Sequence, residues 1–235
     1  ALHVACMALE LGPGDWVWTV PNTFVASANC AIYCGAQVDF VDIDPATYTM
    51  CTSALETKLR AAKDNGRLPK VIVPVHLCGQ SADMNAIAKL AHVYGVKIIE
   101  DASHSIGATH QGGPVGNCKY SDITIFSFHP VKIITTCEGG MATTQDKGLA
   151  RRMELARNHG ITREPSEMNH EPDGQWYYQQ ISLGYNYRMT EIQAALGLSQ
   201  LKRLDQFVER RRALASQYNA LLSSLPLQLP FQNPE

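Results

Sequence analysis

The sequence has no excess of positive charge. It holds 20 Lys and Arg residues against 22 Asp and Glu residues, a formal net charge of −2. Proteins that bind nucleic acid or an anionic lipid surface need a basic patch, so neither partner is expected. Long apolar runs are also missing; Pro74 and His76 interrupt the stretch that begins at Val71. We therefore expect no bilayer-spanning segment, no signal peptide and a cytoplasmic location.

Paired cysteines are absent as well. The seven cysteines include no CxxC pair, which argues against a secreted disulfide framework and a zinc knuckle. Most of them are expected to pack as small apolar residues in a reducing cytosol. His104 and His110 lie on opposite sides of a turn pattern, with no carboxylate at ligand spacing. A metal site is therefore not predicted.

The sequence does have the length and apolar content of one large globular domain, with 235 residues of which 45% are hydrophobic. Such a chain buries roughly 70% of the surface that its unfolded form exposes. Apolar patterns alternate between the two types of regular structure. Helices are predicted at 2–10, 24–34, 52–63 and 86–94, and strands at 16–20, 37–41, 71–75, 96–100, 123–128 and 141–144. This order predicts a three-layer α/β/α sandwich with a mainly parallel sheet, whose ligands bind at the carboxyl ends of the strands.

The last third of the sequence has a different character. Residues 160–187 are polar, aromatic and rich in turn residues, as in a lid, an interface or a disordered loop. Thr190 and Gln193 fit a capping box that opens one long amphipathic helix through about Leu222. Its apolar face is predicted to contain Leu201, Leu204, Val208 and Leu214.

The boundaries of the sequence suggest an excerpt, because it starts inside a helical pattern at Ala1 and stops after the proline-rich run 226–234. We expect a large domain over residues 1–200. Residues 201–235 are predicted to form a long helix and a linker toward a smaller C-terminal domain outside this sequence.

Two residues at expected strand ends could carry chemistry. Asp101 follows the strand pattern 96–100 at the expected edge of the cleft, with a helix N-cap as the lesser alternative. Lys132 follows the pattern 123–128, where a solvated surface charge is the simpler explanation. Considered together, an amine that condenses with an aldehyde and a carboxylate that keeps a pyridine nitrogen protonated are the two groups that pyridoxal phosphate chemistry needs from a protein.

Two further residues lie near the same expected edge. Ser127 precedes Lys132 by five residues and could hold a phosphate, although a buried strand serine is an equal alternative. Phe24 could stack on a flat cofactor, although core packing explains the pattern better. Glu138-Gly139-Gly140 allows a tight turn before the next strand.

Several motifs, in order along nearly the whole chain, carry a resemblance to a known family. They are Gly12-Pro13-Gly14-Asp15, Phe40-Val41-Asp42-Ile43-Asp44, Val75 to Gln80, Glu100-Asp101-Ala102-Ser103-His104, Ser127 to Gly140, Arg157-Asn158-His159-Gly160, and Tyr185 to Ala195. By these motifs the sequence resembles the DegT/DnrJ/EryC1/StrS sugar aminotransferases, which have the fold type I of pyridoxal phosphate enzymes. The resemblance implies that fold for the large domain.

The resemblance also implies residue roles. Lys132 is the lysine that joins the cofactor aldehyde, Asp101 the partner of the pyridine nitrogen, and Ser127 a phosphate ligand. Phe24 is the aromatic residue that stacks on the ring. Two more roles concern His104, near the 3′ oxygen of the cofactor, and Asn186, which reaches the phosphate of the neighbouring subunit in a homodimer with shared sites.

The sequences around Lys132 and Asp101 are most similar to those of the pseudaminic-acid branch of the family. That branch implies transfer of an amino group from L-glutamate to C4 of a UDP-linked 4-keto-6-deoxy-N-acetyl sugar, by a ping-pong mechanism. Relatives also carry a phosphate-binding segment before the helix that starts at Ala1 and a smaller C-terminal domain, and both are absent from this sequence.

Other functions stay open on the sequence alone. A pyridoxal phosphate-dependent sugar dehydratase resembles these enzymes but has histidine where Lys132 stands. A catalytically silent regulatory or binding module is a further alternative, because a fold does not fix a function. A dinucleotide oxidoreductase lacks its GxGxxG signal; Gly112 to Gly116 fits a hairpin turn instead. A hydrolase built from His129 and Cys137 lacks the sequence context of such enzymes.

Overall fold

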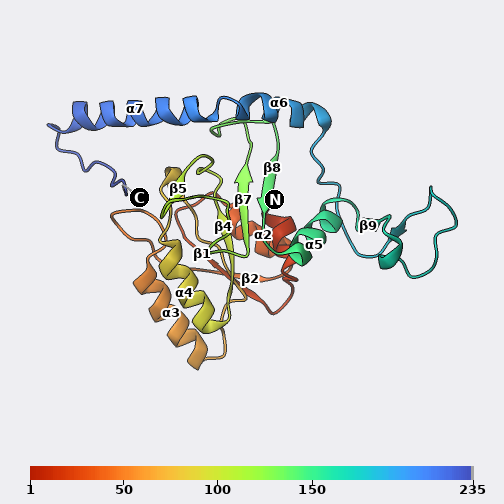
Figure 1. The fold of residues 1–235 in the computed structure, drawn as a ribbon. Helices are drawn as coiled ribbons and strands as arrows, with labels where there is room; N and C mark the ends of the chain where they lie inside the picture. Colours follow the sequence, from red (N-terminus) through yellow and green to blue (C-terminus); the bar gives the residue numbers. More distant parts are fainter. Residues whose placement is uncertain (234–235) are drawn as a thin grey trace.

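A six-stranded sheet forms the centre of the computed structural model, which describes residues 1–233 (Figure 1). The strand order is β2-β1-β3-β4-β7-β8. The first five strands are parallel, and β8 runs antiparallel to β7. The bounds are β1 Trp16–Thr19, β2 Gln37–Phe40, β3 Val71–Ile72, β4 Lys97–Asp101, β7 Ile123–Ser127 and β8 Gly140–Thr143.

Helices cover both faces of the sheet, as the nearly continuous burial of residues along the central strands β1, β3, β4 and β7 requires. On one face, Val17 and Val71 pack with the helices α1 Leu2–Ala8, α2 Ala26–Tyr33 and α5 Lys147–Arg157. On the other face, Trp18 and Ile72 pack with α3 Thr52–Asp64 and α4 Met84–Tyr94. Successive strand residues point to opposite faces of the sheet, so a strand that is covered by helices on both faces is apolar at nearly every position. The predicted three-layer sandwich with a mainly parallel sheet is confirmed.

One predicted strand is too long, and one helix was not predicted. The predicted strand 71–75 ends at Ile72, because Pro74 has no N–H to continue the ladder. Val75 still forms an isolated parallel bridge with Asp101. The helix α5 was not predicted, although Asp146 caps it by accepting a hydrogen bond from the Leu149 N–H at 3.0 Å.

The long C-terminal helix was predicted as one piece but consists of two, α6 Glu191–Leu201 and α7 Leu204–Leu222. The predicted capping box of Thr190 and Gln193 is present. The break at Lys202 and Arg203 contains neither glycine nor proline, so no local signal predicts it.

The predicted apolar face of this segment is only partly used. Leu204 packs against a third core cluster around Phe126 and Phe128, and Val208 lies beside Gly107. Leu201 and Leu214 are exposed, contrary to the prediction. Figure 1 shows α6 and α7 lying beyond the carboxyl end of β7. Within residues 1–233, no helix has the length and apolar character needed to cross a membrane.

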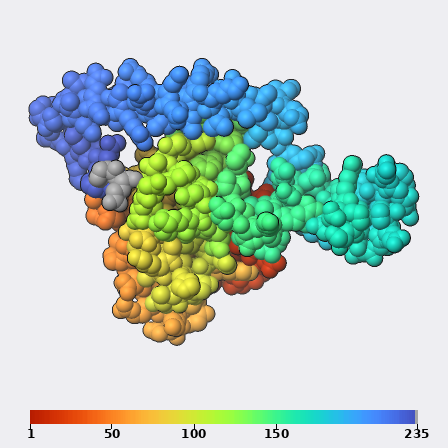
Figure 2. Space-filling view, in the orientation of Figure 1, coloured from red at the N-terminus to blue at the C-terminus, as the bar shows by residue number. Residues whose placement is uncertain are grey.

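Short hairpins complete the structure. β5 Thr109–His110 and β6 Gly113–Pro114 form a hairpin whose turn is Gln111 and Gly112, so the predicted turn at 112–116 is placed too late and in part forms the second strand. Inside the predicted loop 160–187, β9 Ile161–Thr162 pairs with β10 Gln179–Gln180, with the short helix η2 Pro165–Glu167 between them. Figure 2 shows this segment projecting from the body of the molecule.

Candidate functional site

Asp101 is the last residue of β4, at the carboxyl edge of the sheet. Only 4% of it is exposed. Its Oδ2 accepts a hydrogen bond from Ser27 Oγ of α2 at 2.8 Å. Its Oδ1 accepts from the N–H of Ser103 at 3.1 Å and from Ser103 Oγ at 2.6 Å. The bond to the N–H two residues on is an Asx turn. The next α-helix along the chain, α5, starts only at Lys147, so Asp101 is not a helix N-cap.

Lys132 lies in the loop that joins β7 to β8, and it is partly buried. Its backbone N–H donates to His129 O at 2.9 Å and so closes a turn. The base of the loop is held by bonds between Phe128 and both Thr136 and Gly139, at 3.0 and 2.9 Å. A lysine with this support starts from a fixed backbone position at the edge of the sheet.

Ser127 ends β7 and shares a sheet face with Asp101. Asp101 pairs with Ile125 in the parallel ladder, and Ser127 lies two residues further along. Because side chains alternate along a strand, Ser127 projects to the same side as Ile125, toward α1 and α2, about 7 Å beyond it. The hydroxyl and the carboxylate therefore lie on one face of two neighbouring strands.

The pKa of His104 is affected by burial and by the charges of both Lys132 and Asp101. Burial of its ring, and then the Lys132 ammonium, lower the pKa of His104, while the Asp101 carboxylate opposes them. Its Nδ1 accepts a hydrogen bond from the Cys78 N–H at 3.2 Å. Three predicted site residues, His104, Lys132 and Asp101, are thus close enough to interact electrostatically.

The remaining two predicted residues lie on the surface. Phe24, just before α2, is 75% exposed, so the core-packing alternative for it is wrong. Asn186 is exposed and forms an isolated bridge with Asn158. An exposed aromatic ring is free to stack on a ligand, and an exposed amide is free to reach another molecule.

Sequence reasoning missed the two serines that hold Asp101. The spacing of Asp101 and Ser103 is the pattern of an Asx turn and could have indicated that contact. Ser27 is separated from Asp101 by 74 residues, and no local pattern connects them.

The site offers the groups that pyridoxal phosphate requires. A buried carboxylate with fixed orientation suits a protonated ring nitrogen, and a nearby lysine suits an aldehyde. Ser127 Oγ lies 3.4 Å from the His129 N–H, which places a hydroxyl beside a backbone donor. The residues present therefore fit the cofactor. Within residues 1–233, no group of three His, Cys, Asp or Glu side chains could hold a metal ion.

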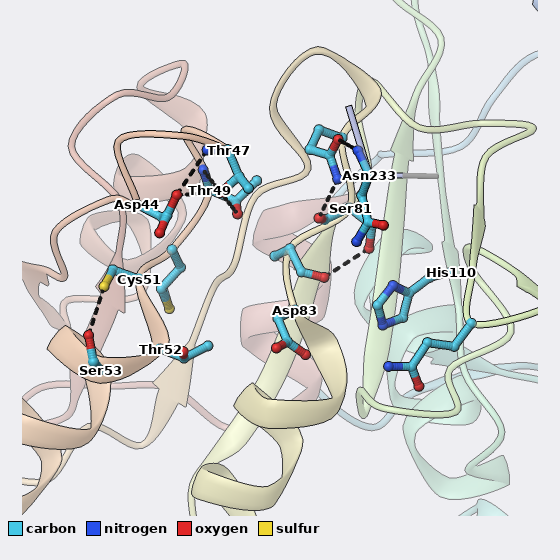
Figure 3. A pocket seen from close by; sticks show the side chains of 14 residues that line it. Asp44, Thr47, Thr49, Cys51, Thr52, Ser53, Ser81, Asp83, His110 and Asn233 are labelled. Atoms are coloured by element: carbon cyan, nitrogen blue, oxygen red, sulfur yellow. Dashed lines mark hydrogen bonds between the residues drawn. The ribbon is translucent and has the colours of Figure 1, made fainter. Parts of the chain in front are cut away.

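A pocket of about 350 Å³ lies elsewhere, between the loops before α3 and α4 (Figure 3). Its lining residues in the described chain include none of the six predicted site residues. Its two carboxylates stabilise local structure, because Asp83 caps α4 and Asp44 accepts from the N–H groups of Ala46 and Thr47. We therefore assign no chemistry to this pocket.

Known proteins are similar to the chain over nearly its whole length. GDP-perosamine synthase of Caulobacter vibrioides is 40% identical over 225 residues, which cover 96% of this chain and 56% of that protein. The chain thus spans little more than half the length of the curated relatives that it matches.

Solved structures have the same fold. A DegT/DnrJ/EryC1/StrS aminotransferase from Brucella abortus matches with a TM-score of 0.88 and 33% identity, over 100% of this chain and 59% of that one. PseC of Helicobacter pylori, an aminotransferase involved in the biosynthesis of pseudoaminic acid, matches with a TM-score of 0.83 and 30% identity, over 96% and 58%.

The sequence model of one family matches residues 1–235 without interruption. With the resemblance of the motifs and the likeness of the fold, this match settles the classification. The chain belongs to the DegT/DnrJ/EryC1/StrS aminotransferase family.

Proposed function

We propose that the protein containing this chain is a pyridoxal phosphate-dependent aminotransferase that acts on a nucleotide-linked keto sugar. The observation that carries the proposal is the placement of the buried Asp101 at the carboxyl end of β4 and of Lys132 in the loop that follows the neighbouring strand β7, with His104 in the loop after β4. Ligands of doubly wound sheets bind at this edge. A general packing role does not require a buried carboxylate and a lysine to interact with the same histidine.

Each residue of the chain has a separate task in the proposed reaction. When bound, pyridoxal phosphate supplies an aldehyde that carries the amino group and a ring that takes up electrons. Lys132 holds the cofactor and then moves a proton to and from the reacting carbon. Asp101 keeps a positive charge on the ring nitrogen, and Ser27 and Ser103 keep Asp101 in one orientation.

The remaining residues bind the rest of the cofactor. We assign Ser127 to the phosphate, Phe24 to the ring face and His104 to the 3′ oxygen. Asn186 is assigned to the phosphate in the neighbouring subunit of a homodimer. The exposure of Phe24 and Asn186 supports these assignments, because both must contact groups outside their own core.

For the substrates, we propose L-glutamate as the donor and a UDP-linked 4-keto-6-deoxy-N-acetyl sugar as the acceptor, in a ping-pong sequence. The similarity to a GDP-perosamine synthase and to PseC supports a nucleotide sugar as the acceptor class. The sequence motif from Ser127 to Lys132 favours the UDP-linked sugar among the nucleotide sugars.

A cofactor titration tests the proposal in the full-length protein. Wild type should develop the visible absorbance band of pyridoxal phosphate joined to a lysine, and Lys132→Ala should lose it. The matched control is Lys89→Ala, which removes an exposed lysine of α4. A wild type without the band, or a Lys132→Ala protein that keeps it, contradicts the assignment and favours a silent module.

The acceptor is tested in the half-reaction. Protein loaded with pyridoxamine phosphate is mixed with UDP-, GDP- or dTDP-linked 4-keto sugars, and the return of the visible band is followed. We expect the UDP-linked N-acetyl sugar to restore it fastest. A faster return with another nucleotide sugar would keep the aminotransferase and replace the substrate, and deoxygenated products would indicate a dehydratase.

A further inference from the structure

A buried glutamate, Glu100, and a buried histidine, His76, form a hydrogen-bonded pair on the face of the sheet opposite to the Asp101 side chain. Glu100 precedes Asp101 in β4, so its side chain points to the opposite face. His76 is 0% exposed and Glu100 is 5% exposed. His76 Nε2 lies 2.8 Å from Glu100 Oε1. A buried carboxylate is costly unless donors surround it, so this pair needs an explanation.

The hydrogen bonds fix the protonation of the pair. The Ala82 N–H donates to His76 Nδ1 at 3.1 Å, so Nδ1 is the acceptor and Nε2 donates to Glu100. Glu100 Oε2 accepts from Ser121 Oγ at 2.9 Å and from Thr124 Oγ1 at 3.2 Å. Burial favours a higher pKa for Glu100, but these bonds, led by that from His76, outweigh it and lower the pKa. Glu100 is thus an anion with three donors, and His76 is its neutral donor.

The backbone beside this pair is bonded to the candidate site. The His76 N–H donates to Asp101 O at 3.0 Å, and the Asp101 N–H donates to Pro74 O at 2.9 Å. Two residues after His76, the Cys78 N–H donates to His104 Nδ1. The segment that carries His76 therefore contacts both Asp101 and His104.

This segment is held in an unusual conformation. Cys78 has a φ of 55° and Gly79 a φ of 91°, both in the left-handed region. A Cβ on Gly79 would lie 3.3 Å from His104 O, so the two loops touch closely here. His76 begins the segment 76–82, and its ring is hydrogen-bonded both to Glu100 of β4 and to the N–H of Ala82 at the end of the segment. The ring therefore ties the two ends of the segment to each other and to β4.

We propose that His76 and Glu100 are positioning residues for the cofactor site. Their hydrogen bond fixes the carboxyl end of β4 and the segment 76–82 from the face covered by α3 and α4. It thereby holds Asp101 and His104 in place on the opposite face. The inference rests on the proposed function, because the positioned residues are those assigned to the cofactor.

Two histidine variants separate the two bonds of the ring. In His76→Asn the side chain can still accept from the Ala82 N–H, but it has no donor that reaches Glu100. In His76→Gln the longer side chain restores a donor to Glu100. We expect His76→Asn to raise the Kd for pyridoxal phosphate at least about tenfold. It should also shift the pH at which the visible band of the bound cofactor changes, and His76→Gln should recover most of both effects.

The matched control is His92→Asn, the same change at an exposed histidine of α4, which should leave both readouts unchanged. If His76→Asn keeps the wild-type Kd for pyridoxal phosphate and the wild-type visible spectrum, whether or not its melting temperature falls, the positioning role is rejected and the proposed function is unaffected. A wild type that does not bind the cofactor overturns the proposed function as well. If His76→Asn does not fold, Glu100→Gln is titrated instead, and wild-type affinity and spectrum there would equally reject a positioning role.

Discussion

Three donors converge on the Asp101 carboxylate, and each limits a different motion of it. Ser27 Oγ approaches from α2, while the N–H and the hydroxyl of Ser103 approach from the loop that follows β4. Two elements of the chain thus hold the Asp101 carboxylate in one orientation.

Replacement of Asp101 by Asn should separate charge from shape. Asn has nearly the same size but supplies no negative charge to a ring nitrogen, so we expect kcat to fall at least about 100-fold at saturating cofactor. The control is Asp64→Asn, at the exposed end of α3, which should keep wild-type turnover. Turnover of Asp101→Asn within about threefold of wild type would contradict the role of Asp101.

A second carboxylate provides a pH test. Hydrogen bonds from Arg151 and Thr162 lower the pKa of Glu167 to about 2 from the ordinary value of 4.5. Because the pKa is lower in the folded state, Glu167 stabilises the fold above pH 4.5, and this contribution is lost as the pH falls to about 2. Its side chain is 28% exposed, which limits the effect to about 1 kcal/mol.

We therefore expect Glu167→Gln to lower the free energy of unfolding at pH 7 and to approach wild type at pH 2.5, as measured by urea unfolding. Glu56→Gln, which breaks an exposed pair with Arg60, is the control and should change little at either pH. A deficit of Glu167→Gln that is the same at both pH values would refute the assigned pKa.

The sequence predicted the strand-end residues better than their partners. Asp101 and Ser127 follow apolar strand patterns directly, so their positions at the sheet edge could be read from local spacing. Ser27 reaches Asp101 across 74 residues, and His76 reaches Glu100 across 24. Such contacts depend on how the helices and strands pack, and one sequence carries no signal for them.

At the scale of elements, the hairpin β9–β10 is joined to α5 by a glycine with two constraints. Gly160 has a φ of +67°, and a Cβ there would collide with Ser182 O. Gly66, after α3, has nearly the same φ of +64°, but nothing lies within 4 Å of the Cβ position. A side chain would therefore strain the backbone equally at both positions, but it would collide with a neighbour only at Gly160.

Alanine at both glycines should separate these effects. Gly66→Ala should cost about 1 kcal/mol of unfolding free energy, because alanine tolerates positive φ poorly. Gly160→Ala should cost about 2 kcal/mol more, because the hairpin has to shift to relieve the collision. Denaturant unfolding measures both values. Equal losses in the two variants would show that the hairpin moves without cost.

The elements themselves were predictable where local patterns are strong. The alternation of apolar strands and amphipathic helices predicted the three layers, and the capping box predicted the start of α6. Pro74 could have warned that the strand from Val71 would be short. The break between α6 and α7 has no glycine, no proline and no side-chain cap at Arg203, so nothing local marks it.

At the scale of the whole molecule, the surface carries aromatic residues that a single chain leaves exposed. Phe24, Tyr33 and Tyr187 are exposed around the candidate site and α1, and Trp176 is exposed on the projecting segment 160–187 (Figure 2). Exposed aromatic residues are enriched at protein interfaces. This distribution supports the proposed homodimer, in which Asn186 serves the site of the partner.

Hybrid dimers test this sharing of sites directly. Lys132→Ala and Asn186→Ala should each be inactive as pure full-length proteins. In a mixed dimer, one site combines Lys132 of one subunit with Asn186 of the other and is intact, while the second site lacks both. Each isolated hybrid dimer has one working site of two, so we expect it to recover about half of wild-type activity.

The readout is activity after co-expression of the two variants with different affinity tags and isolation of the doubly tagged dimer. If Asn186 instead acts within its own subunit, each hybrid site lacks one required residue and no activity returns. A mixture of Lys132→Ala with Asp101→Ala is the control. Asp101 ends β4 and Lys132 lies in the loop after the neighbouring strand β7, so both serve the site of their own subunit and should not complement. Activity of Asn186→Ala alone, or a strictly monomeric active protein in sedimentation, would reject the assignment of Asn186.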